Sequence, residues 1–251
     1  TTSLRIYGTL FDSFNIKNPS NLNFFSYSSF SILDLNCLSN CTNLFNVNIS
    51  VSPNIKNSHI LASLPHLTVL KLDDYAPIWL DKETLNSLNC LDEETKTSLL
   101  LEIDELDKIA SSIISKSASD TEKIRAITLN ISNRLEYDLN ANGTEEEAIN
   151  LAIGYNMTPI VDALKGKGVC INYACLFTAL ANRLGLDNYQ DISTNHTWNL
   201  VKTNGAYKGY DITNIDLPYA VLESNNEIYF NLESDYTTFF NTNQEEQLYF
   251  Y

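Results

Sequence analysis

The sequence predicts a mixed α+β fold, and three observations support this prediction. Short apolar segments recur in the first part of the 251-residue chain at offsets of 22 and then 23 residues. From Asp81 onward the apolar residues follow helical spacing instead. Later in the chain, Asn204-Gly205 marks a hairpin turn between two strand-like runs. We therefore expect a repetitive region over residues 1–90 and a second domain over residues 91–251, each with its own core.

The charge balance argues against several classes of partner. The chain has 31 acidic and 16 basic side chains, a formal net charge of -15, and no stripe of Lys and Arg. Such a surface repels phosphate backbones, so we expect no nucleic-acid partner. No stretch approaches the roughly 18 apolar residues of a membrane span, and the first residues lack a signal-peptide pattern. We expect no membrane span in this chain, with any export signal or anchor outside the sequence given.

The five cysteines are Cys37, Cys41, Cys90, Cys170 and Cys175. Their spacing does not match a dense disulfide framework, and it leaves both the compartment and the disulfide state open. Cys37 and Cys41 form a C-x3-C pair, but no second pair of Cys or His accompanies it. We therefore expect neither a metal site nor a cofactor.

The repeating segments of the first region share an L-x-x-L-x-L spacing. The aligned triplets are Leu22, Phe25 and Tyr27; Leu44, Val47 and Ile49; and Leu67, Leu70 and Leu72, with Leu4 and Ile6 in a truncated earlier copy. This pattern resembles a leucine-rich repeat, in which a strand and a return segment form one coil of a solenoid. The alternative is an irregular β-rich region. His59 and His66 fall inside the pattern and need no functional role. Whether the array is part of a longer one is left open.

The middle of the chain predicts helices. Apolar residues of 92–115 lie at helical spacing, and Ser119 or Asp120 can cap a second helix that ends near Tyr137. Thr144 and Glu147 form a capping-box pattern, so we expect the acidic residues 145–147 to start a helix rather than bind metal.

Cys170 is predicted to lie at the N-terminus of a helix. It follows Gly166-Lys167-Gly168, and the apolar residues after it share one helical face as far as Gly185. Backbone N–H groups and the helix dipole at such a position favour a thiolate and can hold an oxyanion. These properties suit a nucleophile, and the alternative is a buried structural cysteine. Cys175 points to another face of the helix and is assigned to the core.

The hairpin places a histidine and an aspartate together. If Asn204-Gly205 forms the turn between strands 191–202 and 206–213, Trp198 faces Asp211. His196 and Asp211 are then diagonal neighbours on one face, about 7 to 8 Å apart at the backbone. We predict that His196 acts as the base for Cys170 and that Asp211 orients the imidazole. Trp198 shares this face, where it either lines the substrate site or belongs to the core.

Three motifs together resemble the core of the transglutaminase-like superfamily, which has a papain-like cysteine fold. They are G-V-C-x-x-Y-A-x-L-F-x-A-L at Cys170, H-x-W-N-x-V at His196 and Y-D-x-T at Asp211. The resemblance covers residues 121–213 and includes Leu135-Glu136-Tyr137-Asp138, placed on the helix before the core. It implies a Cys-bearing helix packed on an antiparallel sheet that supplies His and Asp. Ile212 stands where many relatives have proline, and no calcium loop is evident, so calcium dependence is not carried over.

The leading functional hypothesis is a cysteine acyl-transfer enzyme. Cys170 would form a thioester from a glutamine or peptide amide and pass the acyl group to an amine or to water, and the motifs do not separate these outcomes. We expect a protein or peptide substrate, with the repeats recognising a protein partner. The alternative is a catalytically silent binding or scaffold protein. The resemblance suggests a secreted or bacterial-surface location, and the oligomeric state is left open.

Overall fold

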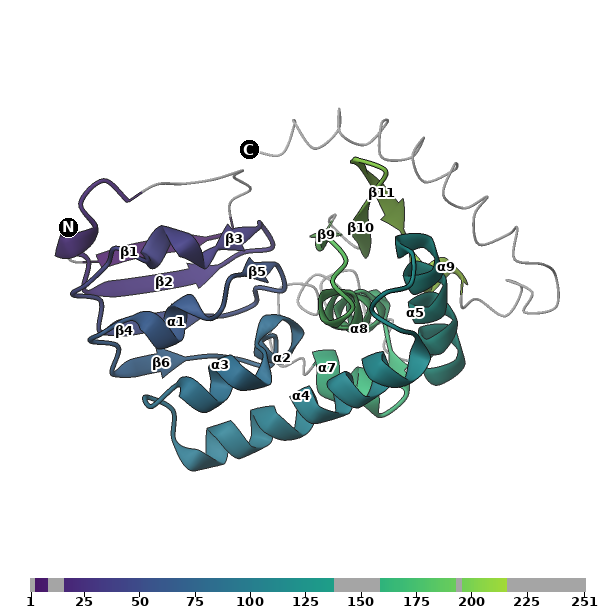
Figure 1. Ribbon diagram of the computed structural model, residues 1–251, viewed down its shortest axis with the longest axis horizontal. Coiled ribbons are helices and arrows are strands. Elements are labelled where there is room, and N and C mark those ends of the chain that lie inside the picture. The colour runs from purple at the N-terminus through teal and green to yellow at the C-terminus, as the bar shows by residue number, and fades with distance from the viewer. Residues whose placement is uncertain (1–2, 9–15, 138–158, 193–195, 216–251) are drawn as a thin grey trace, which may run out of the picture.

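The computed structural model describes residues 3–8, 16–137, 159–192 and 196–215. In these ranges the chain forms a mixed helix-and-strand fold with two parts that face each other across short helices (Figure 1). The N-terminal sheet has four parallel strands in the order β1-β2-β4-β6. Its strands are β1 (Ser3–Tyr7), β2 (Phe24–Ser28), β4 (Asn46–Ile49) and β6 (Val69–Lys71).

Each strand of the N-terminal sheet pairs with the next copy of the sequence pattern. Phe25 pairs with Val47 and Val47 with Leu70, and all three side chains are buried. Between the strands the chain returns through short segments, most of which also supply buried apolar side chains. These are η1 (Pro19–Asn21), β3 (Leu33–Asp34), η2 (Leu35–Leu38), β5 (Ile55–Lys56) and α1 (Ile60–Ser63). Most of the aligned apolar residues are therefore buried, whereas Leu4, Ile6, Leu67 and Leu72 are partly buried.

Four helices connect this sheet to the rest of the molecule. They are α2 (Ala76–Trp79), α3 (Lys82–Ser87), α4 (Glu93–Ile113) and α5 (Asp120–Arg134). Helix α4 runs beneath both parts in Figure 1. Side chains that accept hydrogen bonds from first-turn N–H groups fix three of the starts: Asp81 for α3, Asp92 for α4 and Ser119 for α5. At α5 the predicted capping residue Ser119 forms a reciprocal box with Glu122.

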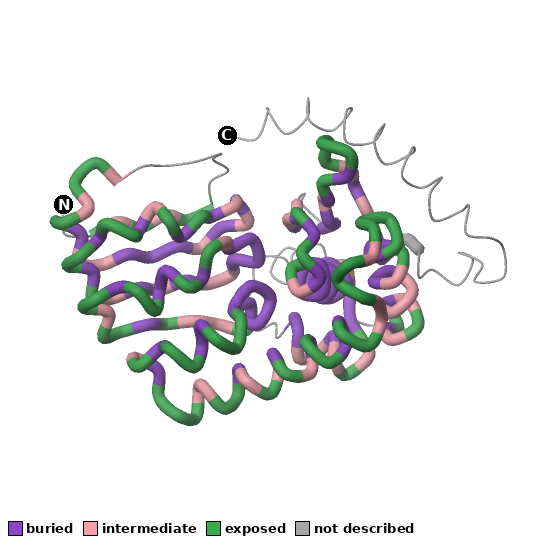
Figure 2. The backbone as a smooth tube through the Cα atoms, in the orientation of Figure 1, coloured by how far each residue is buried: buried purple, intermediate pink, exposed green. Residues whose placement is uncertain are grey.

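The second part is built around α8 (Cys170–Arg183), which packs on a three-stranded antiparallel sheet. That sheet has the order β11-β10-β9, with β9 (Asn188–Ile192), β10 (Thr197–Thr203) and β11 (Ala206–Tyr210). Around it lie β7 (Glu136–Tyr137), α7 (Pro159–Leu164), β8 (Lys167–Gly168) and α9 (Ile212–Ile215). Every residue of α8 from Ile171 to Ala181 is buried, and the helix is the central purple element of Figure 2. A helix that is enclosed in this way gives its N-terminus a fixed position.

Three details of the predicted elements are wrong. The second helix ends at Arg134, because Glu136 donates its N–H to the carbonyl of Gly166 and begins strand β7. The predicted strand over 191–202 is two elements, since Asp191 belongs to β9, which pairs back onto β10. After Tyr210 the chain turns into α9 instead of continuing as a strand to Thr213. The predicted helix start at 144–147 lies outside the described residues.

The sheets of the described chain are mostly parallel, but the sheet on the Cys-bearing helix is antiparallel, as predicted. The antiparallel pairing is confined to β9, β10 and β11, the sheet that carries α8. One cluster of buried apolar side chains extends from Leu22, which follows η1, to Ile212 in α9. The two parts of the molecule therefore share one apolar core. Among the described residues, no helix is long and apolar enough to cross a membrane.

Candidate active site

Cys170 is the first residue of α8, as the sequence predicted. The N–H groups of a helix's first turn have no partner within the helix, and the helix dipole places partial positive charge there. Cys170 is a half-buried free thiol. The start of α8 thus offers N–H donors and partial positive charge near Cys170, and both favour negative charge on the sulfur atom.

Asn172 fixes the backbone just before Cys170. Its Oδ1 accepts the N–H of Val169 at 2.9 Å, and its Nδ2 donates to the carbonyl of Pro159 at 3.1 Å. The side chain rests directly against Gly168, where an added Cβ would lie 2.4 Å from the Cβ of Asn172. A glycine is therefore required at residue 168 for the amide to reach both partners. Sequence reasoning did not identify this role for Asn172.

His196 and Asp211 meet as the hairpin register predicts. Asn199 pairs with Tyr210 and Thr203 with Ala206 around the Asn204-Gly205 turn. His196 Nε2 lies 2.5 Å from Asp211 Oδ2. The Asp211 side chain is fully buried, whereas that of His196 is 30% exposed. The structure thus holds the imidazole by a buried carboxylate and leaves part of the ring open to solvent.

The surroundings of His196 favour its cationic form. Burial alone would lower its pKa, but hydrogen bonds to Asp211 and Cys170, together with their charges, raise the pKa of His196 to about 10. Because Nε2 is bonded to Asp211, Nδ1 is the ring nitrogen available to the Cys170 sulfur. At neutral pH the imidazolium therefore links the carboxylate on one side to the thiol on the other.

Two aromatic side chains border these groups. The Trp198 indole is 5% exposed and stacks on the His196 ring, with centroids 6.1 Å apart and planes inclined by 30°. Tyr137 comes from the other side, because β7 pairs with β8 and places Tyr137 opposite Gly168. Burial, and then the nearby charges of Cys170 and Asp211, raise the pKa of Tyr137. Sequence reasoning placed Tyr137 on a helix and so missed its position beside the thiol.

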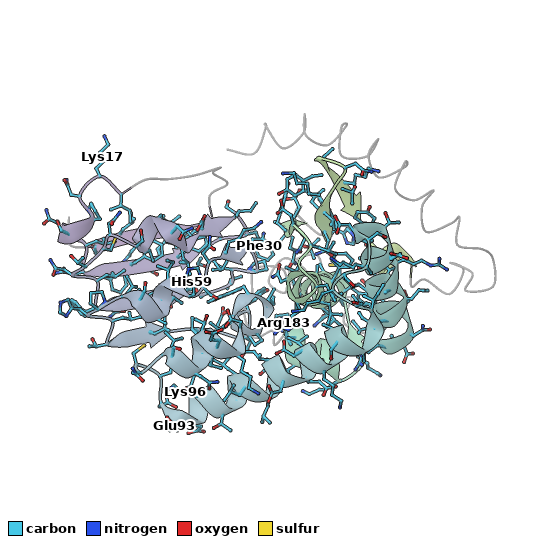
Figure 3. The ribbon with its side chains drawn as sticks, in the orientation of Figure 1. Lys17, Phe30, His59, Glu93, Lys96 and Arg183 are labelled. Carbon is cyan, nitrogen blue, oxygen red and sulfur yellow. The ribbon has the colours of Figure 1, made fainter. Side chains whose placement is uncertain are left out.

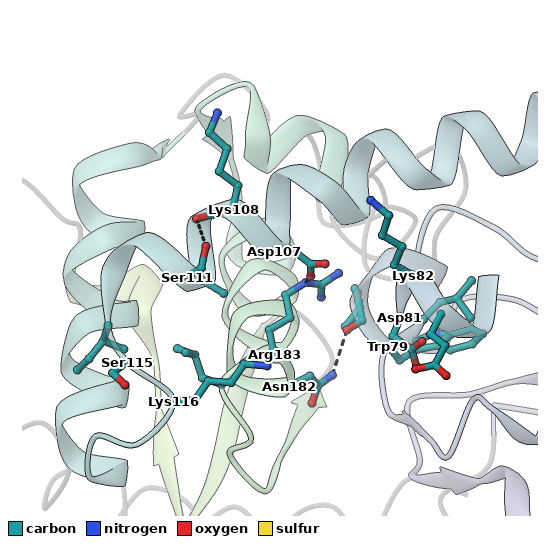
Figure 4. A pocket seen from close by; sticks show the side chains of 16 residues that line it. Trp79, Asp81, Lys82, Asp107, Lys108, Ser111, Ser115, Lys116, Asn182 and Arg183 are labelled. Atoms are coloured by element: carbon teal, nitrogen blue, oxygen red, sulfur yellow. Dashed lines mark hydrogen bonds and ion pairs between the residues drawn. The ribbon is translucent and has the colours of Figure 1, made fainter. Parts of the chain in front are cut away.

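A pocket of about 900 Å³ lies elsewhere, at the opposite end of α8 (Figure 4). Arg183 occupies its floor, where the guanidinium donates to Asp107 Oδ1 at 2.7 Å and to the carbonyls of Ala179 and Pro77. The helix rises 1.5 Å per residue, so this pocket begins roughly 20 Å from Cys170. It belongs to the junction of α2, α4 and α8 and is separate from the cysteine site.

Within the described residues, no group of three or more His, Cys, Asp or Glu side chains is arranged to hold a metal ion. Cys37 and Cys41 are both free thiols, and burial, followed by the charges of Cys41 and Asp34, raises the pKa of Cys37 to about 12. These two thiols are therefore poor candidates for a reactive pair.

One family model and one solved structure are similar to parts of this chain. The model of a family described as the transglutaminase-like superfamily matches residues 107–211, which include Cys170, His196 and Asp211. A solved structure titled "Crystal structure of a TGase" is similar at 18% sequence identity with a TM-score of 0.38. That similarity covers 57% of this chain and 38% of the other, and no curated protein matches the chain. Residues 107–211 are therefore similar to the transglutaminase-like superfamily.

Proposed function

We propose that this domain catalyses acyl transfer with Cys170 as the nucleophile, His196 as the acid and base, and Asp211 as the residue that orients His196. The observation that carries the proposal is the His196–Asp211 hydrogen bond beside a cysteine at a helix N-terminus. Members of this superfamily are generally cysteine enzymes, which agrees with the arrangement. The three groups come from α8, the residue just before β10 and the residue just after β11, so their meeting requires the folded chain.

The first half of the reaction forms a thioester. The Cys170 thiolate attacks the carbonyl carbon of a glutamine side chain or peptide bond, and the oxygen gains negative charge. We assign the stabilisation of that oxygen to the Cys170 backbone N–H, because Cys170 is the first residue of α8. His196 gives its proton to the leaving nitrogen, and ammonia or an amine departs as the carbon–nitrogen bond breaks.

The second half regenerates the thiol. Neutral His196 takes a proton from an incoming amine or water, which attacks the thioester carbonyl. The carbon–sulfur bond then breaks and releases the Cys170 thiolate. Because the imidazole keeps the proton that it took, the pair of imidazolium and thiolate is restored. Asp211 keeps its hydrogen bond to Nε2 throughout and so holds the tautomer that presents Nδ1 to the sulfur.

The test is incubation with a glutamine-containing protein and a fluorescent primary amine, followed by measurement of incorporation, peptide fragments and released ammonia. We expect product in one of these channels from the native protein and none from Cys170→Ala. Cys90→Ala is the matched control, because Cys90 is also a half-buried free thiol but lies between α3 and α4. Incorporation identifies an amine acceptor, whereas fragments or ammonia alone identify water. Equal product from Cys170→Ala and the native protein would contradict the proposal.

We further propose that the N-terminal sheet consists of leucine-rich-repeat coils and recognises a protein partner. The support is that successive parallel strands pair in register, with a core face and an open face. The open face carries Arg5 stacked over Phe24, together with Tyr7 and Val69, which are 55% and 36% exposed. A catalytically silent binding protein remains the second candidate. It is favoured if Cys170→Ala leaves the biological effect of the protein unchanged.

A further inference from the structure

The side chain of Gln190 joins the two elements that carry the candidate nucleophile and base. Gln190 is on β9 and is completely buried. Its Oε1 accepts from the Cys175 thiol of α8 at 3.3 Å, and its Nε2 donates to Thr197 Oγ1 at 2.9 Å. Thr197 is the residue directly after His196. One amide therefore spans from the helix of Cys170 to the strand that begins beside His196.

Thr197 is held from a second direction. Its hydroxyl donates to the carbonyl of Asp191 at 2.6 Å while it accepts from Gln190, so both of its hydrogen-bonding roles are satisfied. Two residues further along the strand, Asn199 Nδ2 donates to the carbonyl of Ala174 at 3.0 Å and to Thr178 Oγ1 at 2.8 Å. Strand β10 is thus attached to α8 through buried polar contacts whose geometry is directional, in addition to apolar packing.

The N-terminal region completes this network through Asn54. Its Oδ1 accepts the N–H of Gln190 at 2.7 Å, and its Nδ2 donates to the carbonyl of Gln190 at 2.6 Å. The second N–H of the same amide donates to the carbonyl of Phe30 at 2.5 Å. Phe30 lies between the N-terminal sheet and the second part of the molecule (Figure 3). Strand β9 is at the edge of its sheet, so Asn54 pairs with its backbone as a neighbouring strand would.

From these contacts we propose that Gln190 is a positioning residue for the Cys170–His196 pair and that Asn54 holds Gln190 in place. The N-terminal region is then a structural part of the active site as well as a recognition surface. This inference rests on the proposed thiol chemistry of Cys170. Its physical basis is that both side chains are buried and bonded at each end, so removing one contact frees either the backbone of β9 or the start of β10.

A nearby surface contact supplies the control. Lys56 and Asp187 form an ion pair of 2.8 Å across the same junction, and both side chains are well exposed. Exposed pairs of this kind contribute little to stability. Lys56→Met removes a contact between the same two regions and leaves Asn54 and Gln190 untouched. It therefore distinguishes the effect of weakening the contact between the N-terminal region and the second part from the effect of losing the buried amide hydrogen bonds.

The experiment measures the rate at which iodoacetamide alkylates Cys170 between pH 5 and 10, together with the melting temperature. The variants are Thr197→Val, which replaces the hydroxyl by a methyl group of similar shape, Thr197→Ser, which keeps it, and Asn54→Ala. We expect Thr197→Val and Asn54→Ala to lower the Cys170 rate at pH 6 by about tenfold, because misplacing a reacting group by 1 Å can cost more than this. Thr197→Ser and Lys56→Met should retain the native pH profile.

A native pH profile in folded Thr197→Val and Asn54→Ala would overturn the proposal, since a merely structural contact changes the melting temperature without changing the profile. If Asn54→Ala does not fold, Thr197→Val and Thr197→Ser decide the question alone. Failure of the proposed chemistry is distinguishable, because in that case the native protein itself shows no enhanced Cys170 alkylation at pH 6. In that case the alkylation rate of Cys170 at pH 6 would be equally low in the native protein and in Thr197→Val.

Discussion

Asp211→Asn is expected to lower the rate of Cys170-dependent acyl transfer by about a thousandfold while leaving the fold intact. The carboxylate is fully buried and bonded to His196 Nε2. An amide has the same shape and can still form a hydrogen bond with the ring. Because it carries no negative charge, it no longer stabilises a positive imidazole ring. The variant can also select the tautomer that carries its proton on the wrong nitrogen. The rate is measured in the amine-incorporation and hydrolysis assays.

The same substitution should change the titration of His196. Bonding to Asp211 is the largest contribution that raises the pKa of His196 to about 10, and it acts against the effect of burial. Removing the charge therefore lowers this pKa toward or below its ordinary value of about 6.5. The imidazolium is then lost at a lower pH than in the native protein. NMR titration of the His196 ring measures the shift.

Asp191→Asn is the control for this prediction. Asp191 is a neighbouring carboxylate on β9 whose pKa is raised by burial, and its Oδ1 accepts the N–H of Ile192 at 2.9 Å. The His196 titration should be unchanged in this variant. An unchanged titration in Asp211→Asn as well would show that the hydrogen bond does not control the imidazole.

Gly168→Ala is expected to destabilise the domain by about 2 to 4 kcal/mol, which is large for the addition of one methyl group. The new Cβ would lie 2.4 Å from Asn172 Cβ and 2.8 Å from its Oδ1. Asn172 must then move, which breaks its hydrogen bonds to Val169 and Pro159 at the start of α8. Denaturant unfolding measures the free-energy change, and Cys170 alkylation should slow in parallel.

A double-mutant cycle tests the cause. Asn172→Ala alone loses the same two hydrogen bonds and should also destabilise the domain. In the Asn172→Ala background the contact with Cβ remains, but Cγ, Oδ1 and the two hydrogen bonds are absent, so Gly168→Ala should cost less than it does in the native protein. Additive costs from the two substitutions would mean that displacement of the Asn172 amide is not the reason for the cost of Gly168→Ala.

The sequence allowed the local features of the site to be predicted because each has a local signal. The Asn-Gly dipeptide sets the β10–β11 register, which brings Asp211 to His196. Small residues before Cys170 and apolar helical spacing after it mark the start of α8. In the N-terminal sheet, the recurrence of buried apolar positions at a fixed offset similarly identifies which strands become neighbours.

The remaining features depend on contacts between distant residues, for which the sequence gives no local pattern. Asn54 and Gln190 are 136 residues apart, and either could be an ordinary surface amide. Tyr137 continues a helical pattern, but pairing of Glu136 with Lys167 overrides it and brings the phenol beside Gly168. The helix therefore ended earlier than predicted because tertiary pairing competes with local propensity.

The most direct test of the proposed site is alkylation of the native protein with iodoacetamide at pH 6, with each cysteine followed separately by mass spectrometry. We predict that Cys170 reacts much faster than Cys37 and Cys90, which are also half-buried free thiols and whose pKa values are raised mainly by burial. His196→Gln should abolish this difference, because it removes the cation that bonds to the sulfur. If Cys170 instead reacts no faster than Cys90 at pH 6, Cys170 and His196 do not form an activated pair and the proposed chemistry is wrong.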